Sequence, residues 1–312
     1  MVGLLPTRME VGIMIDFMKY RFVYFAISMV VIVPGVIALF VWGLQPAIDF
    51  TGGTLLEVEI DQAYRESVGL DSIEQVAIQN GIEVSSIQTS GEGSYLLRAK
   101  PFDQALNTLF QERLASESGV VTVSAIITEK RFETLGPTLG RETLIRALTA
   151  LGIAALVILL FVWKQFNDKK YGICAIVAML HDSLITFGIF AILGYFYGVE
   201  IDTLFMTAVL TILSFSVHDT IVVYDRIRES LRKLPGESYE RILNKAVNET
   251  LVRSINNSMT IIFMLLALFL LGGETIRWFV LALLIGTISG TYSSSFVAAP
   301  LLLVWDKVFG KK

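Results

Sequence analysis

Two His-Asp pairs stand inside apolar stretches of this chain, and their side chains are the ones best placed to do chemistry. His181-Asp182 and His218-Asp219 both lie in segments long enough to cross a bilayer. An ionisable side chain in hydrocarbon costs on the order of 3 kcal/mol, so each carboxylate is expected to have a function and a partner. For Asp219 the candidate partner is Arg253. A carboxylate paired with a guanidinium in a membrane points to proton-coupled work.

The depth of Arg253 follows from the segment to which it belongs. Met259 to Leu271 provides only 13 residues, which is too few to cross about 30 Å of hydrocarbon. The helix must therefore extend upstream to about Leu251, and this carries Arg253 toward the membrane. Asp219 lies a similar distance from the end of its own span near Tyr224. At ~1.5 Å per residue, both side chains should sit roughly 5 to 10 Å from the interface, where they could pair.

Each of these residues also has a purely structural interpretation. Asp219 and Arg253 could form a static ion pair, but we favour a functional pair because a buried ion pair is a costly source of stability. Asp182 could carry a proton or hold a polar contact between helices, and the sequence leaves both open. We expect His218 to hydrogen-bond in helix packing rather than to carry a proton, although histidine titrates in the physiological range.

The composition assigns the chain to the integral membrane proteins. Hydrophobic residues make up 54% of its 312 residues, charged residues only 17%, and the mean hydropathy is +0.65. A soluble domain of this length could not bury so much apolar surface. The single cysteine, Cys174, excludes an internal disulfide and a thiolate metal cluster. Two histidines are too few for a histidine-based metal site, so neither a metal nor another cofactor is expected.

Six apolar segments are long enough to span a bilayer, which predicts an α-helical integral membrane protein. The expected spans are residues 22–43, about 144–163, about 171–197, about 203–224, about 251–271 and about 278–305. The sixth contains Gly286-Thr-Ile-Ser-Gly290, a spacing of small residues typical of close helix packing.

Basic residues gather in alternate loops and so predict the orientation in the membrane. They lie at 164–170, at 226–245 and at 307–312. Residues 1–21 and the C-terminal tail are therefore expected to be cytoplasmic, in a multi-pass protein of the cytoplasmic membrane. Residues 225–250 are expected to form a cytoplasmic loop with an amphipathic helix on the membrane surface.

Residues 44–141 fall between the first two spans, and we expect them to form an extracytoplasmic domain. Asp49, Gly52 and Gly53 are expected to make a tight turn, without chemistry, into a first strand. Asp71-x-x-Glu74 fits a capping box that opens a helix ending at Gly81.

Alternating and helical apolar patterns predict the rest of this domain. The further elements are strands near 82–88 and 95–99, a helix with apolar residues from Phe102 to Leu114, and a last strand near 121–127. The order β-α-β-β-α-β predicts a ferredoxin-like α+β domain. We see no catalytic constellation in it.

Four motifs, in this order of elements, resemble the SecF family of protein-export membrane subunits, part of the SecD/SecF family and the RND superfamily. They are Asp49-Phe-Thr-Gly-Gly-Thr54 after the first span, His181-Asp182, the run from Val217 to Glu229 that includes Asp225 and Arg226, and Glu249-Thr-Leu-Val-Arg-Ser254. The resemblance covers nearly the whole chain.

The resemblance implies a six-helix half of an RND-type assembly that a SecD-like subunit completes. It implies that this assembly acts with the SecYEG channel and the ATPase SecA, and uses the proton-motive force to pull unfolded exported polypeptides outward. The proton-path aspartate and arginine of the family fall on Asp219 and Arg253. The family pattern has asparagine before that aspartate, where this chain has His218.

Two other classes of protein are alternatives. A half-unit of an RND-type exporter of small molecules or lipids would share the helices, although such exporters usually carry two outer domains in one chain. An intramembrane enzyme would need a serine in a protease-like motif, paired catalytic aspartates or clustered histidines, and the sequence has none of these. We therefore expect a proton-driven transport subunit and not an enzyme, with proteins and lipid, and no nucleic acid, as partners.

Overall fold

The computed structural model describes residues 15–65, 67–89, 93–117, 123, 126–166 and 168–309. The chain divides into two compact units. One unit takes residues from 1–45 and 150–312 and is built from long helices, whereas the other takes residues 46–149 and contains a β-sheet.

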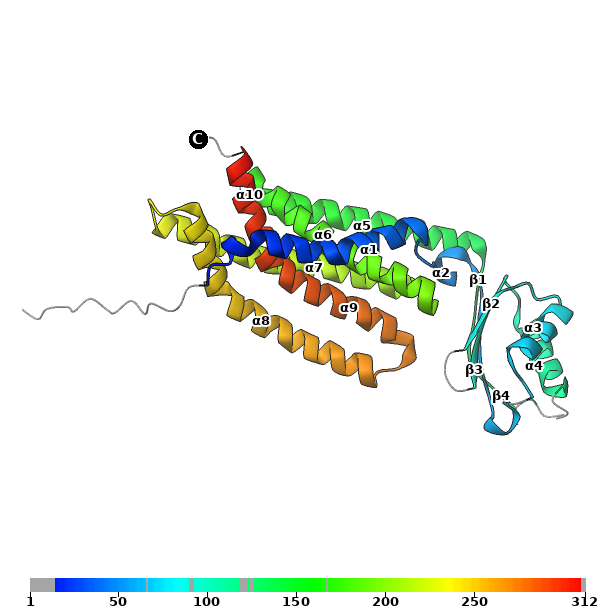
Figure 1. The fold of residues 1–312 in the computed structure, drawn as a ribbon. Coiled ribbons are helices and arrows are strands. Elements are labelled where there is room, and N and C mark those ends of the chain that lie inside the picture. Colours follow the sequence, from blue (N-terminus) through cyan, green and yellow to red (C-terminus); the bar gives the residue numbers. More distant parts are fainter. Residues whose placement is uncertain are drawn as a thin grey trace, which may run out of the picture. The chain divides into compact units, whose positions relative to one another are not determined.

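Long helices form the first unit (Figure 1). Within the described residues, six helical stretches are long and apolar enough to cross a membrane, which confirms the number of spans expected from the sequence. In chain order the helices are η1 (Met18–Tyr20), α1 (Arg21–Val41), α5 (Pro137–Phe166), α6 (Lys169–Tyr197), α7 (Thr203–Lys233), α8 (Tyr239–Leu271), α9 (Glu274–Ser293), the π-helical segment η4 (Ser294–Ala298) and α10 (Ala299–Phe309). The first part of α5, up to Thr149, belongs to the second unit.

Side-chain caps fix where three of these helices begin. Asp168, Asp202 and Ser238 each accept a hydrogen bond from a backbone N–H in the first turn of α6, α7 and α8. Such bonds satisfy amide groups that have no partner within the helix. At the other end of α6, Gly198 adopts a φ of +63°, which stops the helix without a steric penalty.

The expected surface loop at 225–250 is much shorter in the structure. Helix α7 continues to Lys233 and α8 already begins at Tyr239. The apolar stripe that suggested a separate surface helix is buried within the first turns of α8, where Ile242, Ala246 and Val247 are at most 3% exposed. Because these residues continue the same helical period as the span, they extend α8 and do not form an element of their own.

Glycines allow two pairs of helices to pack closely. Helix α1 lies against α6 (Figure 1), and a Cβ atom on Gly188 would come within 2.6 Å of the Gly35 Cα atom. Helix α9 lies against α7, where a Cβ atom on Gly286 would overlap the side chain of Ile212. One on Gly290 would come within 3.4 Å of the Ser216 Cα atom. The small-residue spacing in the sixth span is therefore a packing feature, as predicted.

The second unit has the predicted ferredoxin-like topology. It contains α2 (Ile48–Thr51), β1 (Gly53–Ile60), η2 (Gln62–Tyr64), α3 (Leu70–Gln79), β2 (Val84–Thr89), β3 (Ser94–Ala99), α4 (Gln104–Glu117) and β4 (Ile127–Leu135). The strands pair antiparallel in the order β2-β3-β1-β4, with Gly53 of β1 opposite Leu135 of β4. Helices α3 and α4 cover one face of this sheet (Figure 1). Leu56, Val58 and Ile60 of β1 are buried in the core.

Two local predictions for this unit were wrong. Asp71 is not a helix cap, because α3 starts at Leu70 with Gly69 at the cap position and no side-chain cap bond. The last strand is β4 at Ile127–Leu135 and not a strand near 121–127, of which Val121 and Ala125 lie outside the described residues. Three consecutive residues of β4, Glu129, Lys130 and Arg131, are charged, so its pattern is less apolar than that of the segment before it.

The end of α3 and the entry to β1 both depend on glycine. Gly81 has a φ of +73°, and its N–H and that of Ile82 bond to the carbonyls of Ile78 and Ala77, which closes the helix in a Schellman motif. Gly52, also at +73°, follows α2, and a Cβ atom there would lie 2.6 Å from the Cα atom of Pro137. The tight turn at Gly52 therefore lets β1 start directly beneath the first turn of α5.

Candidate functional site

The Asp219 carboxylate is buried between three helical segments. It lies on α7 and is 6% exposed. Ser254 of α8 places its Oγ atom 2.8 Å from Oδ1 and 2.7 Å from Oδ2, and Ser294 at the start of η4 donates a hydrogen bond to Oδ2. Both partners are neutral hydroxyls. Asp219 is thus an acid held inside the helical unit by groups that can donate or accept a proton in a hydrogen bond.

The expected pair between Asp219 and Arg253 is not made in this structure. Arg253 is exposed, and within the described residues its guanidinium forms no ion pair. The reason is helical phase: Ser254 points at Asp219, and its neighbour Arg253 is turned away by about 100°. Arg253 instead lines a cavity of about 410 Å³ together with Asp225, Arg226, Glu229 and Glu249 among others.

His218 does not pack between the described helices of this chain, contrary to the sequence prediction. It lies on the exposed face of α7, and it makes no hydrogen bond to any residue that the structure describes. Asp219 is the next residue and faces inward, so the pair His218-Asp219 divides between the two faces of α7. The imidazole is therefore not part of the hydrogen-bonded site around Asp219.

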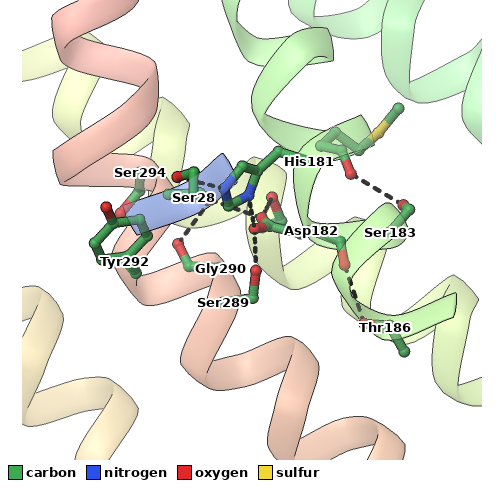
Figure 2. Close-up of polar contacts among 12 residues, drawn as sticks. Ser28, His181, Asp182, Ser183, Thr186, Ser289, Gly290, Tyr292 and Ser294 are labelled. Carbon is green, nitrogen blue, oxygen red and sulfur yellow. Dashed lines mark hydrogen bonds and ion pairs between the residues drawn. The ribbon is translucent and has the colours of Figure 1, made fainter. Parts of the chain in front are cut away.

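Asp182 is the centre of a second and larger polar cluster (Figure 2). Its carboxylate is 0% exposed and accepts hydrogen bonds from serines of α7 and α9. The Oγ atoms of Ser216, Ser289 and Ser293 lie 2.6 Å, 2.5 Å and 2.7 Å from its oxygens. The Nδ1 atom of His181 lies 3.0 Å from Oδ1. With four donors, the carboxylate uses most of its acceptor capacity inside the protein.

His181 links this cluster to α1. Its Nε2 atom lies 2.9 Å from the Oγ atom of Ser28 (Figure 2). If Nδ1 carries the proton and donates it to Asp182, Nε2 must accept from the Ser28 hydroxyl, so the carboxylate fixes the tautomer of the ring. The ring also stacks on Tyr292, whose hydroxyl donates to the Tyr24 carbonyl oxygen at 2.8 Å. The structure thus joins four helices through one acidic residue.

The serines that surround both aspartates were missed from the sequence. Three of them belong to one hydroxyl-rich stretch, Ser289-Gly-Thr-Tyr-Ser-Ser-Ser295, in the sixth span. This span carries no charge, and we therefore treated it as a packing element. Its density of hydroxyls was a usable signal, because polar side chains in a membrane helix are expected to find partners on neighbouring helices.

A π-helical turn sits where this stretch meets Asp219. Ser294 to Ala298 form η4 between α9 and α10. Tyr224, five residues after Asp219 on α7, donates a hydrogen bond from its hydroxyl to the Ala298 carbonyl oxygen at 3.2 Å. Helix α7 therefore holds both ends of the π-helical segment, and such segments occur often at functional sites.

The other motif residues form ion pairs at the end of α7. The Arg226 guanidinium places Nε 2.7 Å from Glu249 of α8 and Nη1 2.5 Å from Glu229. Asp225 pairs with Arg228 at 3.6 Å. The pair with Glu249 joins α7 to α8, whereas the other two lie within α7. All three are partly or fully exposed, so each contributes little stability by itself. In the part of the chain that the structure describes, no group of three or more His, Cys, Asp or Glu side chains could hold a metal ion.

Comparison with protein-family models gives two matches. The model described as protein export membrane protein SecD/SecF, C-terminal, matches residues 116–308. The model described as the SecD/SecF GG motif matches residues 37–63, which include Gly52 and Gly53. Together these matches contain both aspartates, Arg253 and the glycine turn.

Similar proteins are known in several bacteria. The protein translocase subunit SecF of Thermobaculum terrenum is 41% identical over 313 aligned positions, which cover 94% of each chain. The subunit SecDF of Bacillus subtilis is 32% identical over 93% of this chain but only 38% of its own length. A crystal structure of SecDF from Thermus thermophilus, described as a translocon-associated membrane protein, superposes with a TM-score of 0.81 at 30% identity and covers 96% of this chain and 39% of that one. The chain therefore belongs to the SecD/SecF family of protein export membrane proteins.

Proposed function

We propose that this chain is the SecF-like subunit of a Sec protein translocase, and that with a SecD-like partner it uses the proton-motive force to complete protein export across the cytoplasmic membrane. Relatives that match nearly the whole chain are named protein translocase subunits, which supports the export role. In Bacillus subtilis the matching region is part of a longer SecDF chain, and this supports a SecD-like partner. The SecYEG channel, SecA and the exported polypeptide are the further partners of this proposal.

Asp219 is the proposed proton carrier, and its surroundings are the observation that carries the proposal. A carboxylate in a membrane-spanning helix has a strong reason to bind a proton when no cation neutralises it. In this structure its partners are the hydroxyls of Ser254 and Ser294, and Arg253 is turned away. These surroundings support the proposal that Asp219 takes up and releases a proton.

Ser294 suits both charge states of Asp219. It donates to the ionised carboxylate, and its Oγ atom also lies 3.1 Å from the carbonyl oxygen of Thr291. When Asp219 is protonated, Ser294 can turn its proton toward Thr291 and accept from the acid instead. A proton can thus enter or leave with a hydroxyl rotation, and no buried group loses its partner.

Arg253 is proposed to act in the other half of the cycle. It sits one residue from Ser254 and faces a cavity that also contains Asp225 and Glu249. A rotation of α8 by up to about 100° would bring the guanidinium toward an ionised Asp219, and protonation would release it. Each proton that crosses about 100 mV supplies roughly 2.3 kcal/mol, enough to bias such a rearrangement of helices.

The SecD-like partner is proposed to cover a polar face of α7 and α8. Polar side chains that face lipid are costly in a membrane span. On α7 and α8, at positions within the spans, the exposed polar residues include Thr207, Thr211, Ser214, His218, Arg253, Asn256, Asn257 and Thr260. A partner subunit that covers this face would shield the polar groups and complete the surroundings of Arg253.

Cysteine labelling tests the orientation that export requires. The α+β unit should face outward and the turn between α7 and α8 inward. With Cys174 replaced by serine, a single cysteine at the exposed Ser85 should react with an impermeant reagent on intact cells, and one at Glu237 only after lysis. The reverse pattern would rule out the outward-pulling role.

Asp219→Asn is the variant that tests the proton site. In inverted membrane vesicles with an imposed proton gradient, it should abolish the gradient-dependent part of export and leave the SecA-driven part intact. Glu142→Gln, which removes an exposed carboxylate paired with Arg146 on α5, is the matched control and should respond fully. A full response of Asp219→Asn in a complex that assembles normally would mean that Asp219 is not the proton carrier.

A further inference from the structure

We propose that Asp182 is a positioning residue for the proton site at Asp219, and that it acts through the adjacent hydroxyls of Ser293 and Ser294. This inference deepens the proposed role of Asp219 and rests on it. Asp182 lies on α6 and Asp219 on α7, and the two carboxylates have separate sets of hydrogen-bond partners.

Consecutive residues connect the two acids. Ser293, the last residue of α9, donates to Asp182, and Ser294, the first residue of η4, donates to Asp219. The direction in which Ser294 points depends on the rotation of the chain at Ser293, because successive side chains of a helix differ by about 100°. By holding Ser293, Asp182 fixes the rotation that aims Ser294 at Asp219.

Asp182 also fixes the helix that carries Asp219. Ser216 lies one turn before Asp219 on α7, and its hydroxyl donates to Asp182 at 2.6 Å. On α9 the same carboxylate accepts from Ser293 in the last turn of the helix, at 2.7 Å, and from Ser289 one turn earlier, at 2.5 Å. Two walls of the Asp219 site are thus bonded to one completely buried side chain.

The third wall is tied to this frame by a separate hydroxyl pair. Thr291 of α9 places its Oγ1 atom 2.6 Å from the Oγ atom of Ser258 on α8. Ser258 lies one turn after Ser254, the other donor to Asp219, and both are buried. Both donors of the proton site therefore depend on the last turn of α9, which Asp182 holds through Ser293.

The same contacts make Asp182 a poor carrier for a proton in transit. It is 0% exposed, and all of its donors come from within the helical unit. A proton arriving there would displace one of four hydrogen bonds at once. The structure therefore separates the two acids, with Asp219 carrying the proton and Asp182 holding the donors in place.

Other titratable groups lie on the segments packed around Asp219, and their protonation also affects its own. On α6, α7, α8 and α9 they include His181, Asp182, His218, Tyr224, Asp225, Arg226, Glu249, Arg253 and Tyr292. The main test therefore replaces serine by alanine, which leaves all of these charges in place. A variant that lacks the Asp182 charge is compared only with another variant of the same background.

Infrared spectroscopy can follow Asp219 directly. The full chain, purified with its SecD-like partner and placed in lipid nanodiscs, is titrated with acid, and the band of the protonated carboxyl group is assigned by its loss in Asp219→Asn. Ser294→Ala should raise the pH midpoint of this band by about one unit, because the ionised Asp219 carboxylate loses the hydrogen bond that Ser294 donates to it. Ser293→Ala should also raise this midpoint, and the proton affinity of Asp219 should increase about threefold or more, although Ser293 does not touch Asp219.

Ser289→Ala is the matched control. Ser289 also donates to Asp182, but the residue that follows it is Gly290, which has no side chain to reach Asp219. In this variant the proton affinity of Asp219, measured from the midpoint, should change by less than about twofold. An equal shift in Ser289→Ala and Ser293→Ala, or no shift in Ser293→Ala, would overturn the proposal.

A double substitution tests whether Asp182 is the other end of the link. In an Asp182→Asn background, Ser293→Ala should have little further effect, because residues in one network are not additive. The same threefold shift in both backgrounds would show that Ser293 acts without Asp182, against the proposal. If the Asp182→Asn variant does not assemble, the comparison of Ser293→Ala with Ser289→Ala still tests the proposal.

The infrared midpoint is measured without export, so the two proposals can fail separately. If Ser293→Ala shifts the midpoint as expected but Asp219→Asn exports normally, the proton-carrier role is rejected and the positioning role is retained.

Discussion

Replacing Gly188 with alanine should separate α1 from α6 and weaken the helical unit. The added Cβ atom would lie 2.6 Å from the Cα atom and 2.9 Å from the carbonyl carbon of Gly35. Carbon atoms prefer separations of about 3.5 to 4.0 Å, so the two backbones would have to move apart by about 1 Å. Both atoms belong to backbone, which does not swing aside as a side chain would. Overpacking of this kind costs about 1 to 3 kcal/mol.

The effect should extend to the polar cluster. Ser28 and His181 precede Gly35 and Gly188 by about two helical turns, on the same faces of α1 and α6. The hydrogen bond between Ser28 Oγ and His181 Nε2 measures 2.9 Å, and a shift of even half the expected size would weaken it. Ser28→Ala should therefore cost less stability in the Gly188→Ala background than in the parent chain.

Unfolding of the purified protein in a titration with denaturing detergent would measure this loss. Gly152→Ala is the control, since Gly152 is an exposed glycine on α5 with no atom within 4 Å of the added Cβ. We expect it to leave stability unchanged or to raise it slightly. The reasoning would be refuted if Gly188→Ala unfolded at the same detergent concentration as Gly152→Ala.

Three further predictions concern other parts of the chain. Gly52→Ala should make the α+β unit more sensitive to proteolysis than Gly43→Ala, because both glycines have a φ near +72° but only Gly52 would meet backbone atoms, those of Pro137. Asn248→Ala should expose the chain before α1 to protease, since the Asn248 amide bonds both the N–H and the carbonyl oxygen of Ile15, at 3.1 Å and 2.8 Å. His218→Asn should leave the detergent stability of the isolated subunit unchanged, because the imidazole is exposed on α7 and contributes no hydrogen bond within the described residues; a clear loss would indicate a packing role.

Those features that depend on apolar pattern alone were predictable from the sequence. Hydropathy identified six spans, and the alternation of Leu56, Val58 and Ile60 identified the central strand. Glycine positions were equally readable, because Gly81 adopts the positive φ that ends a helix and Gly52 the one that a tight turn needs. These signals work because each residue reports on its own backbone or its own burial.

Partners across helices were much less predictable. The sequence places Asp219 and Arg253 at similar distances from the ends of their helices, but it does not give the rotation of one helix against another. Ser254 and Arg253 are neighbours on α8, but the rotation of this helix turns Ser254, and not Arg253, toward Asp219. The same uncertainty hid the exposure of His218, since α7 is apolar on most sides and its buried face is set by packing.

The pairing of β1 with β4 sets a constraint on how the chain is synthesised. Strand β1 lies inside the sheet, yet its neighbours β3 and β4 are made after it, and Leu135, the partner of Gly53, is among the last residues of the unit to emerge. The sheet cannot close before that point, and contacts so distant in sequence form slowly. Helix α5 begins at Pro137, immediately afterwards, so the final strand and the second membrane helix leave the ribosome almost together. Folding of the α+β unit and insertion of that helix are therefore coupled in time, and a delay in either leaves β1 with an unpaired edge.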